Sequence, residues 1–540
     1  MALREKTTAY FSKLNPSTGL PLANYPIAGQ AEIIHVIRQA RRHQREWQNA
    51  PLKDRASVLK AVEVLLKKEA ERLAKLVSQE VGKPVSEVYE TELLSAVGIL
   101  GYYATTGPKI LKERLLPLDK SILMGRLHWR RLVPRGVVGI ISPWNFPLAI
   151  PTSGIAAALM AGNAAILKPS EHSPATGLAL CAIFQQALRQ KGFSPELVQC
   201  VIGDGQSGQW LCQPAQDITD SVDYAIFTGS GKTGRRIREM MSESGREASL
   251  ELGGSDPTII LPDSDYDAAT SYALWGRLTN AGQMCAATKR LIVPKHDYEE
   301  ILSLLKNKVA QLKVGPPENP ENQIGPLISE AQRQLVLAQV EEALSKGARL
   351  ITGGKALPGK GYFMQPTVLA DVFLNARVVN EEVFGPVLPV LAYDSVEEAI
   401  ALANQSSFGL TASVFGPVAK ARSVAEKLQA GCVTINDVGA TSFSVAQIPW
   451  RGWKASGPGG SHGEQSLLEL CLQQTQSVNL LYAFPTFRKQ PWHYSKGEYQ
   501  KNRLSLGNTL LHHYAGESWL EKLSPKLLLA LLAHRSSRKL

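Results

Sequence analysis

Short runs of aliphatic and β-branched residues alternate with helix-like segments, and this alternation restricts the fold more than any other feature. The first run covers residues 137–142, and a helix-like segment over 152–161 separates it from a second run over 164–168. Similar runs begin at Val198, Tyr224, Thr258, Leu291 and Val433. Runs without polar alternation are typical of strands buried on both faces of a parallel sheet. The pattern predicts βαβ units in a doubly wound α/β fold, with a second α/β domain beginning near Gly253.

Composition is that of a large soluble globular protein. Its 540 residues are 44% hydrophobic and 20% charged, which suffices for a sizeable core and excludes disordered and disulfide-scaffold classes. Residues 126–131 alternate in polarity and predict an exposed hairpin. Residues 31–103 predict successive amphipathic helices, and within residues 54–68 the apolar positions are Val58, Leu59, Val62, Leu65 and Leu66.

The net charge of +11 is unevenly distributed along the chain. Residues 486–540 contain ten Lys or Arg against three Asp or Glu, so the preceding residues are only weakly basic. A nucleic-acid-binding body is therefore not indicated, whereas a basic C-terminal extension is predicted.

Cysteine and histidine spacings argue against a metal site. None of the six cysteines forms a C-x-x-C pair, and none of the ten histidines has H-E-x-x-H spacing. The first residues lack the apolar stretch of a signal peptide, and no run approaches the roughly 18 apolar residues of a membrane span. We expect a cytoplasmic protein with reduced cysteines.

A glycine-rich turn follows the run that begins at Tyr224. Gly229, Gly231 and Gly234 match the dinucleotide fingerprint, in which backbone N–H groups approach a pyrophosphate at a helix N-terminus. A tight turn without a ligand is the alternative interpretation. A nucleoside triphosphatase is disfavoured, because Ile226 occupies the position where that motif requires glycine.

Cys285 is the cysteine with the most reactive predicted surroundings. Asn280 and Gly282 precede it as in a loop or helix start, and Lys289 and Arg290 follow it, so we expect a lowered thiol pKa. The alternative is a small buried hydrophobe, which is the interpretation kept for the other five cysteines.

Three polar positions beside the predicted strands are further candidates. Glu251 lies between two leucines, where burial would raise its pKa and suit it to general-base chemistry. Asn145 follows the first run and could donate to an oxyanion, while Lys168 and Glu171 end the second run and could bind ribose hydroxyls. The alternatives are a buried structural glutamate, a turn-capping asparagine and a surface ion pair.

Taken together, these residues resemble the NAD(P)-dependent aldehyde dehydrogenase superfamily. The similarity extends from about residue 15 to about residue 474. Seven motifs occur in the order of the family: residues 143–147, 168–171, 227–234, 251–254, 282–285, 381–386 and 449–457.

The resemblance implies a mechanism. Cys285 would attack the aldehyde, Asn145 and the backbone N–H of Cys285 would hold the oxyanion, and Glu251 would activate water to hydrolyse a thioester. The presence of Glu251 favours a carboxylic acid product over transfer to coenzyme A. The alternative is a catalytically inactive relative that serves as a membrane or assembly scaffold. The presence of all three residues argues against it.

The resemblance also implies a cofactor site. Trp144, Lys168, Glu171, Gly229, Ser230, Gly234, Glu382 and Phe384 would bind the dinucleotide. Glu171 favours NAD, because its carboxylate would repel a 2′-phosphate. The basic residues Lys232, Arg235 and Arg236 could accept a 2′-phosphate, so NADP is the alternative cofactor.

The implied domains are an NAD-binding domain over residues 1–115 and 137–253 and a catalytic domain over 254–446. Residues 116–136 and 464–485 would form a small oligomerisation hairpin and strand, which predicts a homodimer or homotetramer. Arg451 and Trp453 depart from the glycine-rich stretch usual in the family, so the resemblance does not predict the shape of the substrate entrance.

The extension over residues 486–540 is a further departure from the family. Ser524 and Pro525 predict a helix start before the apolar residues 527–533. With Arg535, this segment could lie on an anionic membrane surface, which would favour long-chain or other apolar aldehydes as substrates. The alternative is a helix packed on the enzyme or on a neighbouring subunit.

Overall fold

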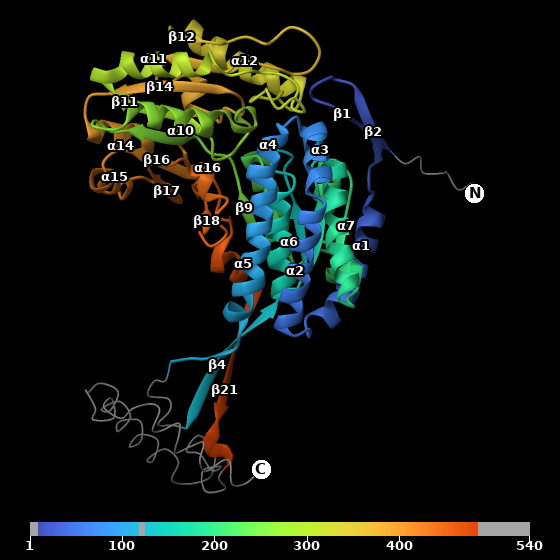
Figure 1. Ribbon diagram of the computed structural model, residues 1–540. Coiled ribbons are helices and arrows are strands. Elements are labelled where there is room, and N and C mark those ends of the chain that lie inside the picture. The colour runs from blue at the N-terminus through green and yellow to red at the C-terminus, as the bar shows by residue number, and fades with distance from the viewer. Residues whose placement is uncertain (1–8, 118–124, 216, 484–540) are drawn as a thin grey trace, which may run out of the picture. The chain divides into compact units, whose positions relative to one another are not determined.

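The computed structural model describes residues 9–117, 125–215 and 217–483 (Figure 1). These residues fall into two compact units, one within Met1–Leu111 and Val133–Leu472, the other within Lys112–Leu132 and Gln473–Leu540. The predicted tail helix and basic extension lie outside the described residues. No helix in the described part of the chain is long and apolar enough to cross a membrane.

The first sheet of the larger unit has five parallel strands in the order β7-β6-β5-β8-β9. Its central strands are almost wholly buried, as the uninterrupted apolar runs predicted. The sheet confirms the predicted doubly wound α/β class. The strands are β5 (Val137–Ile141), β6 (Ala164–Lys168), β7 (Val198–Cys200), β8 (Tyr224–Thr228) and β9 (Glu247–Glu251).

Helices surround this sheet. Helix α2 packs against α5 and α7, and it buries Val58, Leu59, Val62 and Leu66 as its amphipathic pattern predicted. The helices are α1 (Gln30–Trp47), α2 (Leu52–Lys68), α3 (Ala70–Val81), α4 (Val85–Glu87), α5 (Leu94–Leu111), α6 (Ala149–Ala161), α7 (Pro174–Gln190), α8 (Gly205–Cys212) and α9 (Gly231–Glu243). A π-helical segment, η1 (Val88–Leu93), joins α4 to α5.

The second sheet has seven strands in the order β12-β13-β14-β11-β10-β16-β17, all parallel except the β12–β13 pair. The apolar runs predicted β10, β11 and β17, whereas β12, β13, β14 and β16 were not predicted. The strands are β10 (Asp256–Ile260), β11 (Thr288–Pro294), β12 (Arg349–Thr352), β13 (Thr367–Ala370), β14 (Val387–Tyr393), β16 (Thr411–Phe415) and β17 (Cys432–Ile435).

Helices of this half pack on the second sheet and complete one large apolar core (Figure 1). They are α10 (Tyr266–Leu278), α11 (Tyr298–Val309), α12 (Glu330–Ser345), α13 (Arg377–Asn380), α14 (Val396–Asn404), α15 (Val418–Ala425) and α16 (Gly439–Ser442). Helix α17 (Gly463–Glu469) packs instead against α5 and α6. Short pairs complete the unit: β1 (Tyr10–Leu14) with β2 (Pro21–Pro26), β15 (Phe408–Gly409) with β19 (Trp453–Lys454), and β18 (Trp450–Arg451) with β20 (Gly460–Ser461).

A three-stranded sheet in the order β21-β4-β3 includes the polar residues 126–131. Strand β21 is exposed along most of its length. The strands are β3 (Arg114–Leu115), β4 (Arg126–Pro134) and β21 (Cys471–Asn479).

Candidate active site

Cys285 lies in a strained loop between a 3₁₀ turn, η5 (Thr279–Gly282), and strand β11. Asn280 and Ala281 both have φ of 53°, and Gly282 has φ of 74°. Two consecutive non-glycine residues in the left-handed region must be held by their surroundings. The Glu87 carboxylate does so, accepting the Asn280 backbone N–H at 2.7 Å.

Burial determines the protonation state of the Cys285 thiol in the cofactor-free chain. It raises the pKa to about 12, and the nearby carboxylates of Glu382, Asp256 and Glu251 add to this effect. Lys289 lowers the pKa but does not compensate for burial. The expected lowering of the thiol pKa is therefore wrong for this state.

The two cations that follow Cys285 donate hydrogen bonds to backbone carbonyls. Lys289 Nζ donates to the carbonyls of Met284 at 2.9 Å and Cys285 at 2.5 Å, and it lies 3.1 Å from Glu382. Arg290 donates to the carbonyls of Ser255, Leu402 and Ala403. Both therefore fix the loop and its neighbours, and Arg290 does not supply the positive potential expected from the sequence.

Asn145 follows β5 and is buried against the same loop. Its Nδ2 donates to the Gln283 carbonyl at 3.0 Å, and Asn280 Nδ2 donates back to the Asn145 carbonyl at 3.1 Å. An amide nitrogen carries two hydrogens, so this single bond leaves donor capacity for another acceptor.

A buried ion pair fixes the segment that carries Asn145. Lys83 Nζ lies 2.6 Å from Glu92, and both side chains are fully buried. Glu92 also accepts the backbone N–H groups of Leu148 and Ala149 at the start of α6. Lys83 Nζ lies 3.8 Å from the centre of the Phe146 ring, so the residue next to Asn145 is held as well.

Glu251 ends β9 and is buried, as its apolar neighbours indicated. Burial raises its pKa to about 7, while hydrogen bonds from Ser461 and Thr228 oppose that shift. A carboxyl with a pKa near neutrality is suited to proton transfer at physiological pH.

Gly253 and Gly254 let three segments meet beside Glu251. A Cβ on Gly253 would lie 2.1 Å from Glu382 Oε2, and a Cβ on Gly254 would lie 2.9 Å from the Cys285 carbonyl oxygen. The approach at Gly254 is to backbone and requires glycine, whereas at Gly253 the end of the Glu382 side chain occupies the space. Glu251, Cys285 and Glu382 are thus gathered from β9, the loop before β11 and the loop before β14.

The glycine-rich turn has the geometry of a phosphate cradle. Ser230 caps α9, and its hydroxyl accepts the Thr233 N–H. A Cβ would lie 2.7 Å from Phe227 at Gly229 and 2.6 Å from Leu252 at Gly234. The two glycines therefore allow close packing, and the helix N-terminus supplies backbone donors suited to an anion.

The other predicted cofactor residues lie in two groups. At the end of β6, Lys168 is buried, and its Nζ lies 3.8 Å from the more exposed Glu171 carboxylate. Near Cys285, the rings of Trp144 and Phe384 meet edge to face at 5.7 Å, and Lys289 Nζ lies 6.0 Å from the Phe384 ring centre. The donors and aromatic faces of these two groups could hold a dinucleotide.

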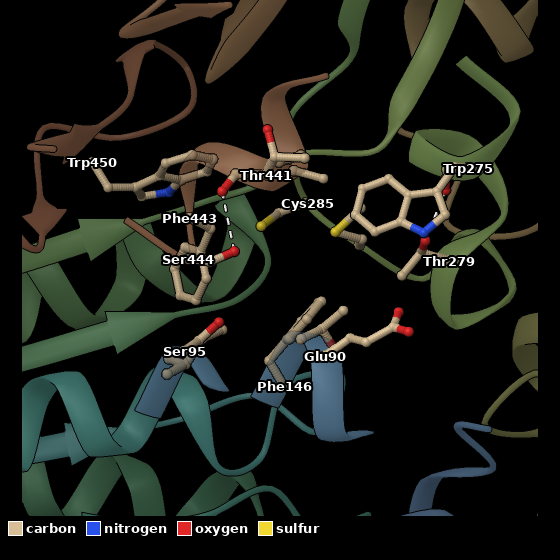
Figure 2. A pocket seen from close by; sticks show the side chains of 15 residues that line it. Glu90, Ser95, Phe146, Trp275, Thr279, Cys285, Thr441, Phe443, Ser444 and Trp450 are labelled. Carbon is tan, nitrogen blue, oxygen red and sulfur yellow. Dashed lines mark hydrogen bonds between the residues drawn. The ribbon is translucent and has the colours of Figure 1, made fainter. Parts of the chain in front are cut away.

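A cavity of about 140 Å³ opens on Cys285. Figure 2 shows Trp275 on one side of Cys285 and Phe443 and Trp450 on the other. None of the described lining residues is Lys or Arg. Trp453 is 51% exposed and does not line the cavity, so Trp450 is the nearby residue that shapes it.

Several residues of the site were not predicted from the sequence. Arg277, at the end of α10, donates to the carbonyls of Gly282, Val383 and Gly385 and so joins the Cys285 loop to the loop that carries Glu382. Arg277 and Glu87 were both missed because their contact partners include residues distant in the sequence. In the described part of the chain, no cluster of three or more His, Cys, Asp or Glu residues could hold a metal ion.

The fold and the site define a nucleotide-dependent oxidoreductase with a cysteine at its centre. The profile of the aldehyde dehydrogenase family matches residues 3–476. The chain is 36% identical to the succinate-semialdehyde dehydrogenase [NADP(+)] of Deinococcus radiodurans over 480 residues, which cover 89% of this chain and 96% of the relative. It is 35% identical to a betaine aldehyde dehydrogenase of Cereibacter sphaeroides, with coverage of 86% and 93%.

A solved NAD+ complex of an aldehyde dehydrogenase from Bacillus cereus superposes with a TM-score of 0.81 at 34% identity, covering 87% of this chain and 93% of that one. The chain belongs to the aldehyde dehydrogenase family, as the motifs predicted. It catalyses NAD(P)-dependent aldehyde oxidation.

The raised pKa of Cys285 predicts slow alkylation of the cofactor-free enzyme at neutral pH. Because only the thiolate reacts, the iodoacetamide rate should rise about tenfold per pH unit between pH 7 and pH 10. Mass spectrometry of the Cys285 peptide measures this rate, with Cys285→Ser as the control. A rate that levels off below pH 8 would contradict the effect of burial.

Proposed function

We propose that the protein oxidises apolar aldehydes to carboxylic acids through a thioester on Cys285. The observation that carries the proposal is that Asn145 binds the loop of Cys285 and that Glu251 lies close enough to Cys285 to affect its charge. The roles of these residues follow from their chemistry and surroundings.

The first step is attack by the Cys285 sulfur on the aldehyde carbon, which forms a carbon–sulfur bond and a thiohemiacetal as the thiol loses its proton. The free N–H of Asn145 and the backbone N–H of Cys285 stabilise the developing oxyanion. Trp144 and Phe384 would hold a nicotinamide, which would supply the acceptor for the hydride that leaves the thiohemiacetal carbon as the thioester forms. The thiol proton passes to solvent, so Glu251 remains ionised as the base of the second step.

Hydrolysis completes the reaction. Ionised Glu251 accepts a proton from water, whose oxygen attacks the thioester carbon and breaks the carbon–sulfur bond. The products are the carboxylic acid and the Cys285 thiol. Since the pKa of Glu251 is about 7, the base form accumulates as pH rises through neutrality.

Glu251→Gln should separate acylation from hydrolysis. Steady-state turnover should fall by about 10²–10⁴-fold, because the general base is lost. Rapid mixing with aldehyde and cofactor measures the first turnover as a burst of reduced nicotinamide and the later turnovers as a slope, with Cys285→Ser as the control without a burst. Unchanged turnover in Glu251→Gln would overturn the role of this residue.

The cavity supports apolar aldehydes as substrates. Phe146, Trp275, Phe443 and Trp450 form aromatic walls beside Cys285, with no basic side chain in the described lining to pair with a carboxylate. A succinate semialdehyde would therefore bury its charge without a partner, which is costly. The expectation of long-chain substrates that rested on the tail remains a prediction, since the tail is outside the described residues.

Chain length should govern substrate preference. Within a series of straight-chain aldehydes, kcat/KM should rise about fourfold per added methylene until the cavity is filled. Trp450→Ala should lower kcat/KM for hexanal more than for acetaldehyde, whereas the exposed Trp453→Ala should change neither. A higher kcat/KM for succinate semialdehyde than for hexanal would contradict the apolar assignment.

NAD is the proposed cofactor. The Glu171 carboxylate, beside Lys168 at the end of β6, can accept hydrogen bonds from ribose hydroxyls, and it would face the extra phosphate of NADP. The exposed cations Lys232, Arg235 and Arg236 of α9 would weaken the preference for NAD over NADP without reversing it.

Glu171→Gln should therefore shift the cofactor preference. The ratio of kcat/KM for NADP to that for NAD should rise at least about tenfold, because like charges placed together cost several kcal/mol. Glu243→Gln, an exposed change at the far end of α9, is the matched control. An unchanged ratio would remove Glu171 from the cofactor site.

We also propose a homodimer or homotetramer. Strand β21 is an exposed edge of the small three-stranded sheet, with Leu472 and Val478 exposed along it. Such an edge supports pairing with another copy of the chain. Contact of the basic extension with a membrane surface remains a sequence prediction.

A further inference from the structure

The strained turn before Cys285 is tied to a carboxyl group that no step of the proposed reaction uses. Glu87 ends the short helix α4, and its Oε2 accepts the backbone N–H of Asn280 at 2.7 Å. Asn280 and Ala281 both lie in the left-handed region, where a residue other than glycine persists only if its surroundings hold it. A side chain 193 residues away in the sequence therefore supports this turn.

Asn280 transmits this restraint to the side chain that would hold the oxyanion. Asn280 Nδ2 donates to the Asn145 carbonyl at 3.1 Å and lies 3.3 Å from the Gln283 carbonyl oxygen. Asn145 Nδ2 donates to the same Gln283 carbonyl at 3.0 Å. Because the two amides share one acceptor, the position of Asn280 determines where Asn145 presents its remaining N–H.

The same turn also determines where Cys285 lies. The backbone N–H and the side-chain Nε2 of Gln283 both donate to the Asn280 carbonyl at 3.0 Å. Gln283 is fully buried, and its Oε1 accepts the Ile328 N–H at 2.8 Å. Cys285 follows two residues later, so a shift of the Asn280 backbone would move the nucleophile as well as the oxyanion donor.

Burial determines what kind of acceptor Glu87 is. It raises the pKa of Glu87 to about 8, and Glu90 adds to this effect while Lys83 opposes it. Lys83 is already paired with Glu92 at 2.6 Å. At pH 7, Glu87 is therefore mostly protonated, and the oxygen without the proton accepts the Asn280 N–H. Glutamine has nearly the same shape and the same neutral acceptor, so Glu87→Gln is the conservative variant.

We propose that Glu87 is a positioning residue that aligns Asn145 with Cys285 for the attack on the aldehyde. This inference rests on the roles proposed above for those two residues. Glu87 is not among the described residues that line the cavity, so it acts on the reaction through Asn280 and leaves substrate affinity unchanged. A misplacement of about 1 Å caused by a residue far from the chemistry can cost about 10²-fold in rate.

Single-turnover mixing tests this role, with the enzyme in excess over hexanal and with saturating NAD. In Glu87→Met, which fills the same space without an acceptor, the rate of reduced nicotinamide formation should fall about 10²-fold. Glu87→Gln should recover most of this loss, because its amide oxygen accepts the Asn280 N–H. Ser86→Ala, an exposed change on the same short helix, is the matched control and should leave the rate unchanged. The loss in Glu87→Met should lie in kcat, with KM for hexanal little changed.

Relief of strain provides a second measurement. Glycine adopts a positive φ without the penalty that alanine pays, so Ala281→Gly should lessen the support that the turn requires. Introduced into Glu87→Met, it should raise the single-turnover rate about tenfold, the factor that corresponds to the left-handed penalty of a non-glycine residue. A defect unrelated to the turn would not respond to this change.

The outcomes distinguish this inference from the proposed function. An unchanged rate in Glu87→Met, or a loss that either Glu87→Gln or Ala281→Gly fails to reverse, would overturn the positioning role. So would a rise in KM that accounts for the whole loss, or lower thermal stability with an unchanged rate, which is the result of a purely structural role. Asn145→Ala is the reference variant. If it reacts at the unmodified rate, the proposed oxyanion role is contradicted and the inference falls with it, whereas a slow Asn145→Ala beside a normal Glu87→Met overturns the inference alone.

Discussion

The site depends on one close approach between chain segments at Gly253 and Gly254. Glu382 and the Cys285 carbonyl occupy the space that side chains would need at these two positions. Because β9 belongs to the first sheet and β10 to the second, the glycine pair is also the covalent connection between the two sheets. A side chain at Gly254 would press on the Cys285 carbonyl, and one at Gly253 would displace the end of the Glu382 side chain.

Burial acts on the two main ionisable groups in the same direction and with different consequences. It raises the pKa of Cys285 to about 12 and that of Glu251 to about 7. The thiol therefore stays protonated in the cofactor-free chain, while the carboxyl remains able to exchange a proton near neutrality. Hydrogen bonds from Ser461 and Thr228 oppose the effect of burial on Glu251. Cys285 has Lys289 as its opposing cation, and this lysine is already bound to two backbone carbonyls.

The sequence predicted those parts of the molecule that depend on local patterns. The apolar runs identified β5, β6 and β8, and the motif order identified the family. Strands β12, β13, β14 and β16 were missed, although they belong to the second sheet. At the site, the sequence indicated the burial of Glu251 from its flanking leucines. It could not indicate that Arg290 would bind distant carbonyls, or that Glu87 would hold Asn280, because those contacts join segments far apart in the chain.

The π-helical segment η1 affects both the lining of the substrate cavity and the support of the loop that carries Cys285. Glu90 and Thr91 line the cavity from this segment, and Glu87, one residue before it, holds the strained turn that leads to Cys285. A change of substrate range made by reshaping η1 would therefore also alter the support of the nucleophile. The opposite wall has other connections, because Phe443 packs edge-on against buried His462 and Trp450 pairs with Ser461. In the course of divergence, substitutions in the two walls would accordingly be constrained by different neighbours.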